Sequence, residues 1–313
     1  MSQKKRIAEL DYLKFVFIIL MIAFHLVYIG DTYPLAKRFV YTFHMPGFLL
    51  ISGYVLNRAK AVRPFLRSMW WLFVPYAVME VAYVVMASLL PIREHIGHLT
   101  VGVLLSKLLL HPLGPYWYLH TLILCSVTAY LPLHSTLFRL RWRLLMVGLC
   151  YGMLSAAGIV DWANAFYFFV GIVIRQSGRS FVRCFHPAPW TLLPIVLIVL
   201  FLPGMLNKAS LPGMLLVWCI VSLLLWFFRY LGPNVLRLPL YVGRNTLLLL
   251  LFSPVFTMLA KYFQAPLVNF DPTGMLFLLV ALPFAVGGSL SIGWLSDRLH
   301  LSRWLFGSPW SLH

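Results

Sequence analysis

The first apolar segment of the chain contains three ionisable residues, Asp11, Lys14 and His25. Ionisable side chains are rare and costly at membrane depth, so each is a candidate functional residue. On a helix, the eleven-residue interval from Lys14 to His25 puts them within roughly 20° of one face and roughly 16 Å apart along the axis. Asp11 lies three residues before Lys14 and can pair with it on that face. The pattern suits a long anionic ligand whose reactive end lies inside the bilayer.

Two histidines are candidates for acid–base chemistry. His25 is the first, because a near-neutral imidazole is the usual general base for activating a hydroxyl. The second, His44, lies in an apolar run interrupted by Pro46, Gly47 and Gly53. Such interruptions near membrane depth indicate close packing or a bent helix that lines a cavity. The alternative is that each histidine only bonds a neighbouring helix.

Two further polar residues lie inside apolar segments. Glu80 is in the middle of the third segment, where a carboxylate needs a partner. It can orient an imidazole or pair with a cation, so we consider it, with Asp11, part of the catalytic group. Ser52 is a candidate substrate contact, and its alternative role is a small-residue contact between helices.

Basic residues follow the second apolar segment at Arg58, Lys60, Arg63 and Arg67. Arginine forks match phosphate oxygens, and Arg63 and Arg67 share a face if this turn is helical. They are candidate phosphate ligands, although topological charge is the simpler explanation when these residues are taken by themselves. Residues at the start of the fourth segment are candidate sugar contacts or part of an aromatic belt. They are Tyr116, Trp117 and His120.

The elements that position these residues are predicted to be transmembrane helices. The chain is 61% hydrophobic and 11% charged, with a mean hydropathy of +0.87, whereas soluble domains average about 25% charged residues. We therefore predict an all-α membrane protein, a single domain over 1–313 with no soluble domain. About ten spans near the length a helix needs are expected. They are 12–30, 39–57, 68–90, 116–133, 143–160, 163–175, 190–206, 212–229, 245–263 and 273–294.

The net charge of +17 is distributed as membrane topology requires, which argues against a nucleic-acid partner. With a cytoplasmic N-terminus, eighteen of the 25 Lys and Arg fall on the inner side, so the positive-inside rule places both termini in the cytoplasm. Contact with membrane lipids is also expected. The inner cations lie in 4–6, 58–67, 139–143, 175–183, 229–244 and 298–303. The outer cations are Lys37, Arg38, Arg93, Lys107, Lys208 and Lys261.

The four cysteines are scattered, and their spacing predicts neither a disulfide framework nor a metal site. The charges within the first segment, and the lack of a small-residue cleavage site after it, argue against a signal peptide. The outer connection at about 91–115 contains an apolar stretch, Thr100 to Leu110, that is too short to span. An interfacial or re-entrant helix is expected there.

Taken in order, these motifs resemble the acyltransferase 3 family of bacterial integral-membrane acyltransferases, with the fucose 4-O-acetylase-like sugar O-acetylases as the nearest branch. The resemblance covers essentially the whole chain and is sharpest over residues 11–76. It rests on an Asp-x-x-Lys start, the interval to His25, the Phe-His-Met-Pro and Ser-Gly-Tyr motifs after position 42, and basic residues before Pro-Tyr. Trp-Tyr-Leu at 117–119 and Gly-Arg-Asn-Thr at 243–246 are similar to further family motifs.

The resemblance implies a ten-helix core in the bacterial inner membrane that takes an acyl group, usually acetyl, from cytoplasmic acyl-CoA. The acceptor would be a hydroxyl of an extracytoplasmic or lipid-linked glycan. His25 would be the catalytic histidine, and Lys14, Arg63 and Arg67 would hold CoA phosphates. Two departures are a lysine at 14, where many members have arginine, and Ser253, where relatives often have histidine.

Three functional alternatives stay open from the sequence. A proton-coupled carrier or flippase also has broken helices with buried His, Lys and Glu. An inactive relative is the second. Within the enzyme reading, His25 either accepts the hydroxyl proton during direct attack on the thioester or carries the acyl group itself. Acetyl, succinyl and other acyl groups are not distinguished.

Overall fold

The computed structural model describes residues 6–89 and 95–313, and every regular element in these ranges is a helix. The inner cations Lys4 and Lys5 and the outer Arg93 lie outside the described residues. The α-helices are α1 (Ala8–His25), α2 (Val27–Thr32), α3 (Pro34–Val55), α4 (Val62–Leu89), α5 (Val101–Leu109), α6 (Trp117–His134), α7 (Leu140–Ala156), α8 (Trp162–Gln176), α9 (Phe181–Phe185), α10 (Leu192–Phe201), α11 (Leu211–Phe228), α12 (Pro233–Arg244), α13 (Thr246–Leu259), α14 (Gln264–Phe270), α15 (Met275–Arg298) and α16 (Ser302–Leu305). Short 3₁₀ turns are η1 (Gly114–Tyr116), η2 (Pro189–Thr191), η3 (Pro203–Met205) and η4 (Ala260–Phe263).

A helix overlaps each of the ten predicted spans, but α10 (Leu192–Phe201) is only ten residues long within the predicted span 190–206, and the number of transmembrane helices stays a prediction. Within the described residues, four segments are long and apolar enough to cross a membrane by themselves, which identifies an integral membrane protein. The first predicted span differs from the structure, because α1 ends at His25 and a separate helix α2 begins at Val27. The four segments are Val62–Leu89, Leu211–Phe228, Thr246–Phe270 and Met275–Arg298.

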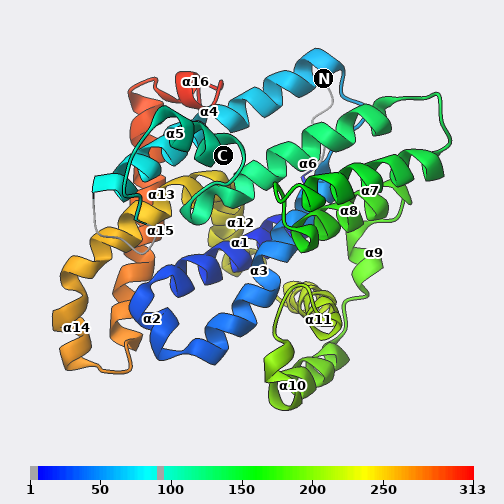
Figure 1. Ribbon diagram of the computed structural model, residues 1–313. Helices are drawn as coiled ribbons and strands as arrows, with labels where there is room; N and C mark the ends of the chain where they lie inside the picture. Colours follow the sequence, from blue (N-terminus) through cyan, green and yellow to red (C-terminus); the bar gives the residue numbers. More distant parts are fainter. Residues whose placement is uncertain (1–5, 90–94) are drawn as a thin grey trace.

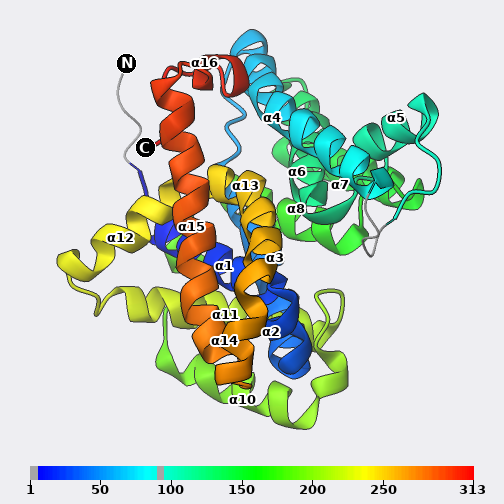
Figure 2. The ribbon, with the colours of Figure 1, turned by 90° about the vertical axis from the view of Figure 1, so that its left-hand side faces the viewer.

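Helices α1 and α3 run side by side through the middle of the molecule (Figure 1). Helix α1 also packs against α11, α12, α13 and α15, and α3 packs against α8 and α11. In the view of Figure 2, α13 and α15 lie beside α1, whereas α4 and α5 lie toward the upper right of the picture. The two helices that carry the candidate histidines are therefore held from several directions.

Small residues bring two pairs of helices into backbone contact. A Cβ at Gly53 of α3 would lie 2.0 Å from the carbonyl oxygen of Phe168 on α8, and one at Gly171 would lie 2.1 Å from that of Leu50. A Cβ at Gly243 of α12 would lie 1.9 Å from the carbonyl oxygen of Asp11 on α1. Only glycine permits these approaches, which resemble small-residue packing in membrane helices.

Both described ends of the chain lie at one end of the molecule. Arg6 lines the same cavity as Arg244, and the neighbouring Asn245 exchanges hydrogen bonds with the backbone of His313 (3.2 and 2.9 Å). Termini on one side are consistent with an even number of spans, while a cytoplasmic location stays a prediction.

The predicted interfacial segment is the short helix α5, and buried side chains of α4 and α6 hold its C-terminal end. Tyr76 donates a hydrogen bond to the carbonyl oxygen of Leu108 (2.7 Å), and the His120 ring bonds that of Leu109 (2.9 Å). These bonds satisfy carbonyls that a helix end leaves unpaired. The location of α5 is thus fixed by packing as well as by its apolar face.

Candidate active site

Both candidate histidines line one cavity of about 650 Å³, which we call the histidine cavity. Its wall is formed by the end of α1, by α2, by the first half of α3, by the start of α6 and by the turn before α11. The lining residues are Met21, His25, Gly30, Asp31, Pro34, Lys37, Arg38, Tyr41, Thr42, His44, Met45, Pro115, Trp117, Leu206, Asn207 and Lys208.

The two imidazoles are held in the same way. Nδ1 of His25 lies 2.7 Å from the carbonyl oxygen of Met21, and Nδ1 of His44 lies 2.8 Å from that of Val40. A carbonyl only accepts hydrogen bonds, so each neutral ring carries its proton on Nδ1 and presents an unprotonated Nε2. Nε2 of the buried His44 has no hydrogen-bond partner within the described residues. Either ring can therefore accept a proton.

Tyr41 connects the two histidines. Its ring centroid lies 5.9 Å from that of His25 and 5.2 Å from that of His44. Its hydroxyl donates to the carbonyl oxygen of Phe24, at 3.3 Å. Tyr41 is three residues before His44 on α3, so helical spacing alone puts them on one face.

A second cavity, of about 830 Å³, lies at the other end of α1, and we call it the basic cavity. Five cations line it, against a single carboxylate, Asp11, among the described lining residues. An excess of cations at a partly enclosed site attracts a ligand with several negative charges. The cations are Arg6, Lys14, Lys60, Arg175 and Arg244.

Asp11 organises two of these cations. Lys14 Nζ lies 2.7 Å from Asp11 Oδ1, and Arg244 Nε lies 3.7 Å from Asp11 Oδ2. The predicted pairing of Asp11 with Lys14 is confirmed, and the contact of Gly243 with the Asp11 backbone explains how α12 delivers Arg244. Asp11 thus lies with the cations, roughly 21 Å along α1 from His25, and is not placed to act on an imidazole.

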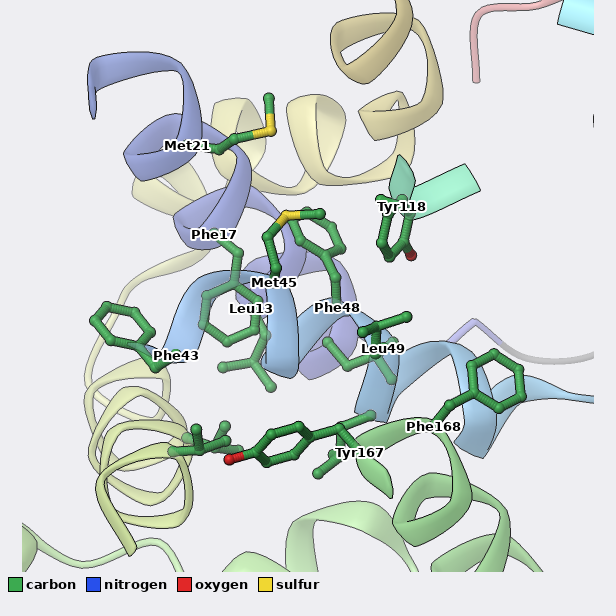
Figure 3. Close-up of a cluster of buried hydrophobic side chains, with 14 of the residues drawn as sticks. Leu13, Phe17, Met21, Phe43, Met45, Phe48, Leu49, Tyr118, Tyr167 and Phe168 are labelled. Atoms are coloured by element: carbon green, nitrogen blue, oxygen red, sulfur yellow. The ribbon is translucent and has the colours of Figure 1, made fainter. Parts of the chain in front are cut away.

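Aromatic and thioether side chains of α1, α3 and α6 form a buried cluster (Figure 3), and several of its members line one cavity or the other. Phe17 of α1 contacts Phe48 of α3, with centroids 5.7 Å apart, and Phe48 contacts Tyr118 of α6 at the same distance. Met21 and Met45 line the histidine cavity, whereas Phe48 and Tyr118 line the basic cavity. Helix α1 contributes residues to the lining of both cavities.

The predicted substrate contacts fall into different places. Trp117 lines the histidine cavity, and the Lys208 ammonium lies 5.4 Å from its ring centroid. Ser52 lines the basic cavity instead, where its hydroxyl is 2.8 Å from that of Tyr118.

Three other predicted site residues lie outside both cavities and hold backbone. Leu113 N–H donates to Glu80 Oε1 at 2.6 Å, so the carboxylate fixes the turn before α6. Tyr116 donates to the carbonyl oxygen of Leu251 at 3.0 Å, and His120 holds the end of α5. These contacts assign Glu80, Tyr116 and His120 to the support of the site.

The predicted phosphate ligands also lie elsewhere. Arg63 and Arg67 line a shallow groove on α4 with the exposed Trp70 and Leu66. Arg58 lines neither cavity, and its carbonyl oxygen is 3.0 Å from the His134 ring.

From the sequence, Arg175 and Arg244 are interpreted as topological charges, but in the structure both line the basic cavity. The Gly-Arg-Asn-Thr motif at 243–246 is a sequence feature that could have pointed to Arg244 as a site residue. No motif points to Arg175, whose guanidinium carbon lies 5.5 Å from the centroid of the Tyr54 ring. Ser253 is buried in α13 and lines neither cavity. No cluster of metal-ligating side chains occurs within residues 6–89 and 95–313.

The family model described as an acyltransferase domain, acyltransferase 3, matches residues 7–294. The chain therefore belongs to the acyltransferase 3 family and is a membrane acyltransferase. No curated protein and no solved structure matches it.

Proposed function

We propose that this protein transfers an acyl group, acetyl in the first instance, from cytoplasmic acyl-CoA to a hydroxyl of a cell-envelope carbohydrate in the bacterial inner membrane. It would be similar to the sugar O-acetylases of its family. The observation that carries the proposal is that one helix, α1, presents the ammonium of Lys14 to the basic cavity and the imidazole of His25 to the histidine cavity. The acyl donor can thus be bound at one end of α1 and the acceptor at the other end.

The basic cavity fits the phosphates of CoA. Lys14, Arg175 and Arg244 come from three helices and line one space, and arginine forks suit phosphate oxygens. Lys14 supplies a positive charge to the cavity but not the bidentate guanidinium of an arginine. The nearby Arg244 supplies a guanidinium. An acyl-CoA thioester provides the activated acyl group that the transfer requires.

His25 is the proposed general base. Its Nε2 accepts the proton of the acceptor hydroxyl while that oxygen forms the ester bond. The carbon–sulfur bond of the donor breaks, and the same proton passes to the leaving thiolate, so no other reactant is consumed. Hydrogen bonding to Met21 holds the ring in the tautomer that this role needs. His44, at the buried side of the same cavity, is the second polar wall for the acceptor.

The proposal is tested with purified protein in nanodiscs, by following thiol release from acetyl-CoA with and without envelope glycans. Release that depends on the glycan, with acetyl recovered on it, is the expected result. If no acyl-CoA is turned over and CoA does not stabilise the protein, the acyltransferase proposal is rejected in favour of a carrier or an inactive relative.

Donor binding should depend on the basic cavity and not on the α4 groove. We expect Arg175→Gln and Arg244→Gln each to weaken CoA binding by about tenfold, because each removes a charge from the cavity lining. Arg63→Gln and Arg67→Gln are the matched controls and should leave it unchanged. The measurement is the CoA-dependent rise in melting temperature. If instead Arg63→Gln and Arg67→Gln weaken CoA binding while Arg175→Gln and Arg244→Gln do not, then Arg63 and Arg67 bind the CoA phosphates, as the resemblance implies.

A further inference from the structure

Three of the six predicted outer cations lie together in the structure. Membrane proteins carry few Lys and Arg on the outer side, since basic residues concentrate on the cytoplasmic side. Yet three of the predicted outer cations, Lys37, Arg38 and Lys208, line the histidine cavity. Lys208 is about 170 residues from the others in sequence, so tertiary packing, and not a local basic run, brings them together.

The cavity has an excess of positive charge. Asp31 is the single carboxylate among its described lining residues, and it lies 3.4 Å from Lys37. Asp31 is exposed, with 68% of its side chain accessible, so its pairing with Lys37 is weak. Arg38 has no ion pair within the described residues. Lys208 pairs with Asp161, which does not line the cavity, so the three cations of this wall exceed the two carboxylates that pair with them.

Lys208 is held in place by several contacts. Its Nζ donates to Asn164 Oδ1 at 2.7 Å and lies 3.1 Å from Asp161 Oδ1. It also lies 5.4 Å from the centroid of the Trp117 ring. Because the ammonium of Lys208 lies over the Trp117 ring, a positive charge and an aromatic side chain meet in one wall, which suits a sugar that carries an anionic group.

We propose that the acceptor is an anionic carbohydrate, whose carboxylate or phosphate is bound by Lys37, Arg38 and Lys208 while its hydroxyl reaches the imidazoles. This inference rests on the proposed function and adds the charge of the acceptor to it. A uronic acid residue and a sugar linked through phosphate share the required chemistry. The three cations then select and orient an anionic acceptor, because a neutral imidazole that acts as a base does not attract a negative charge.

The test compares octyl β-glucuronide with octyl β-glucoside, which have the same ring and alkyl chain and differ in one carboxylate. Binding is measured first, as ligand-dependent thermal stabilisation in nanodiscs of zwitterionic lipid, so that the result does not depend on acyl transfer. We expect the glucuronide to bind about tenfold more tightly, which corresponds to about 1.4 kcal/mol. The advantage should shrink as salt is raised. Octyl α-glucosyl phosphate then distinguishes a phosphate-bearing from a carboxylate-bearing acceptor.

Variants locate the effect. Arg38→Gln and Lys37→Gln should weaken glucuronide binding much more than glucoside binding, which removes most of the preference for the glucuronide. Lys261→Gln is the matched control, because Lys261 is an exposed outer cation that does not line the cavity. Equal binding of the two glycosides by the unaltered protein, or a preference that survives in Arg38→Gln and Lys37→Gln, would overturn the proposal. A preference abolished by phosphatidylglycerol would overturn it as well, and would assign the cations to lipid headgroups.

The transfer assay separates this inference from the proposed function. Acetyl transfer to a neutral glycan, with no preference for the glucuronide, would leave the acyltransferase intact and remove the anionic acceptor. A glucuronide preference that Arg38→Gln removes, in a protein that releases no thiol from acyl-CoA, would keep the anion site and remove the acyltransferase.

Discussion

Replacing His25 by alanine is expected to lower the rate of acyl transfer by about 10²- to 10⁴-fold, which is the range that a positioned proton acceptor contributes. His25 is the last residue of α1 and lines the histidine cavity, at the opposite end of α1 from the basic cavity. CoA binding should therefore be unchanged, which distinguishes a lost base from a lost fold. The measurement is thiol release at saturating glycan, together with the CoA-dependent melting temperature.

His44→Ala is the matched comparison, because its ring is held by the same kind of bond and lines the same cavity. We expect a smaller loss from it, since His44 is only 3% exposed and less accessible to an entering hydroxyl. Transfer that survives in His25→Ala would keep the enzyme but remove His25 as its base. Acyl-protein trapped with donor alone, and absent in His25→Ala, would favour an acylated histidine over direct attack.

The second large effect is expected at the crossing of α3 and α8. Gly53→Ala or Gly171→Ala would place a methyl group at 2.0 or 2.1 Å from a carbonyl oxygen of the facing helix. Backbone cannot move aside as a flexible side chain can, so the helices must separate. Overpacking of this kind costs about 1–3 kcal/mol or more. Because α3 carries His44 and part of both cavities, we expect a lower melting temperature and reduced transfer together.

Gly152→Ala on α7 provides the control for that experiment. No atom lies within 4 Å of a Cβ built at Gly152, and the residue is exposed. Alanine there should be neutral or stabilising by up to about 1 kcal/mol, because glycine is the more costly residue in a helix. If Gly53→Ala and Gly152→Ala have the same melting temperature, α3 and α8 do not touch as closely as the structure shows.

Local patterns in the sequence identify most of the helices. Runs of apolar residues near bilayer length predict helices at ten ranges, and the structure has a helix at each. The break after His25 has no such signal, because no proline or glycine lies between Phe24 and Tyr28. The ends of the short helices α2 and α14 do carry a local signal, because Pro34 and Pro272 follow within two residues of them.

The sequence by itself determines the face of α1 that carries Lys14 and His25, since helical spacing is a local property, and hydropathy determines the membrane class. Only the tertiary structure decides which partners join them. The close contact at Gly243 brings Arg244 to Asp11, while α4 carries Arg63 and Arg67 to a separate groove. Packing also makes Glu80 a backbone support, because the polar group nearest to a buried carboxylate depends on how distant segments meet.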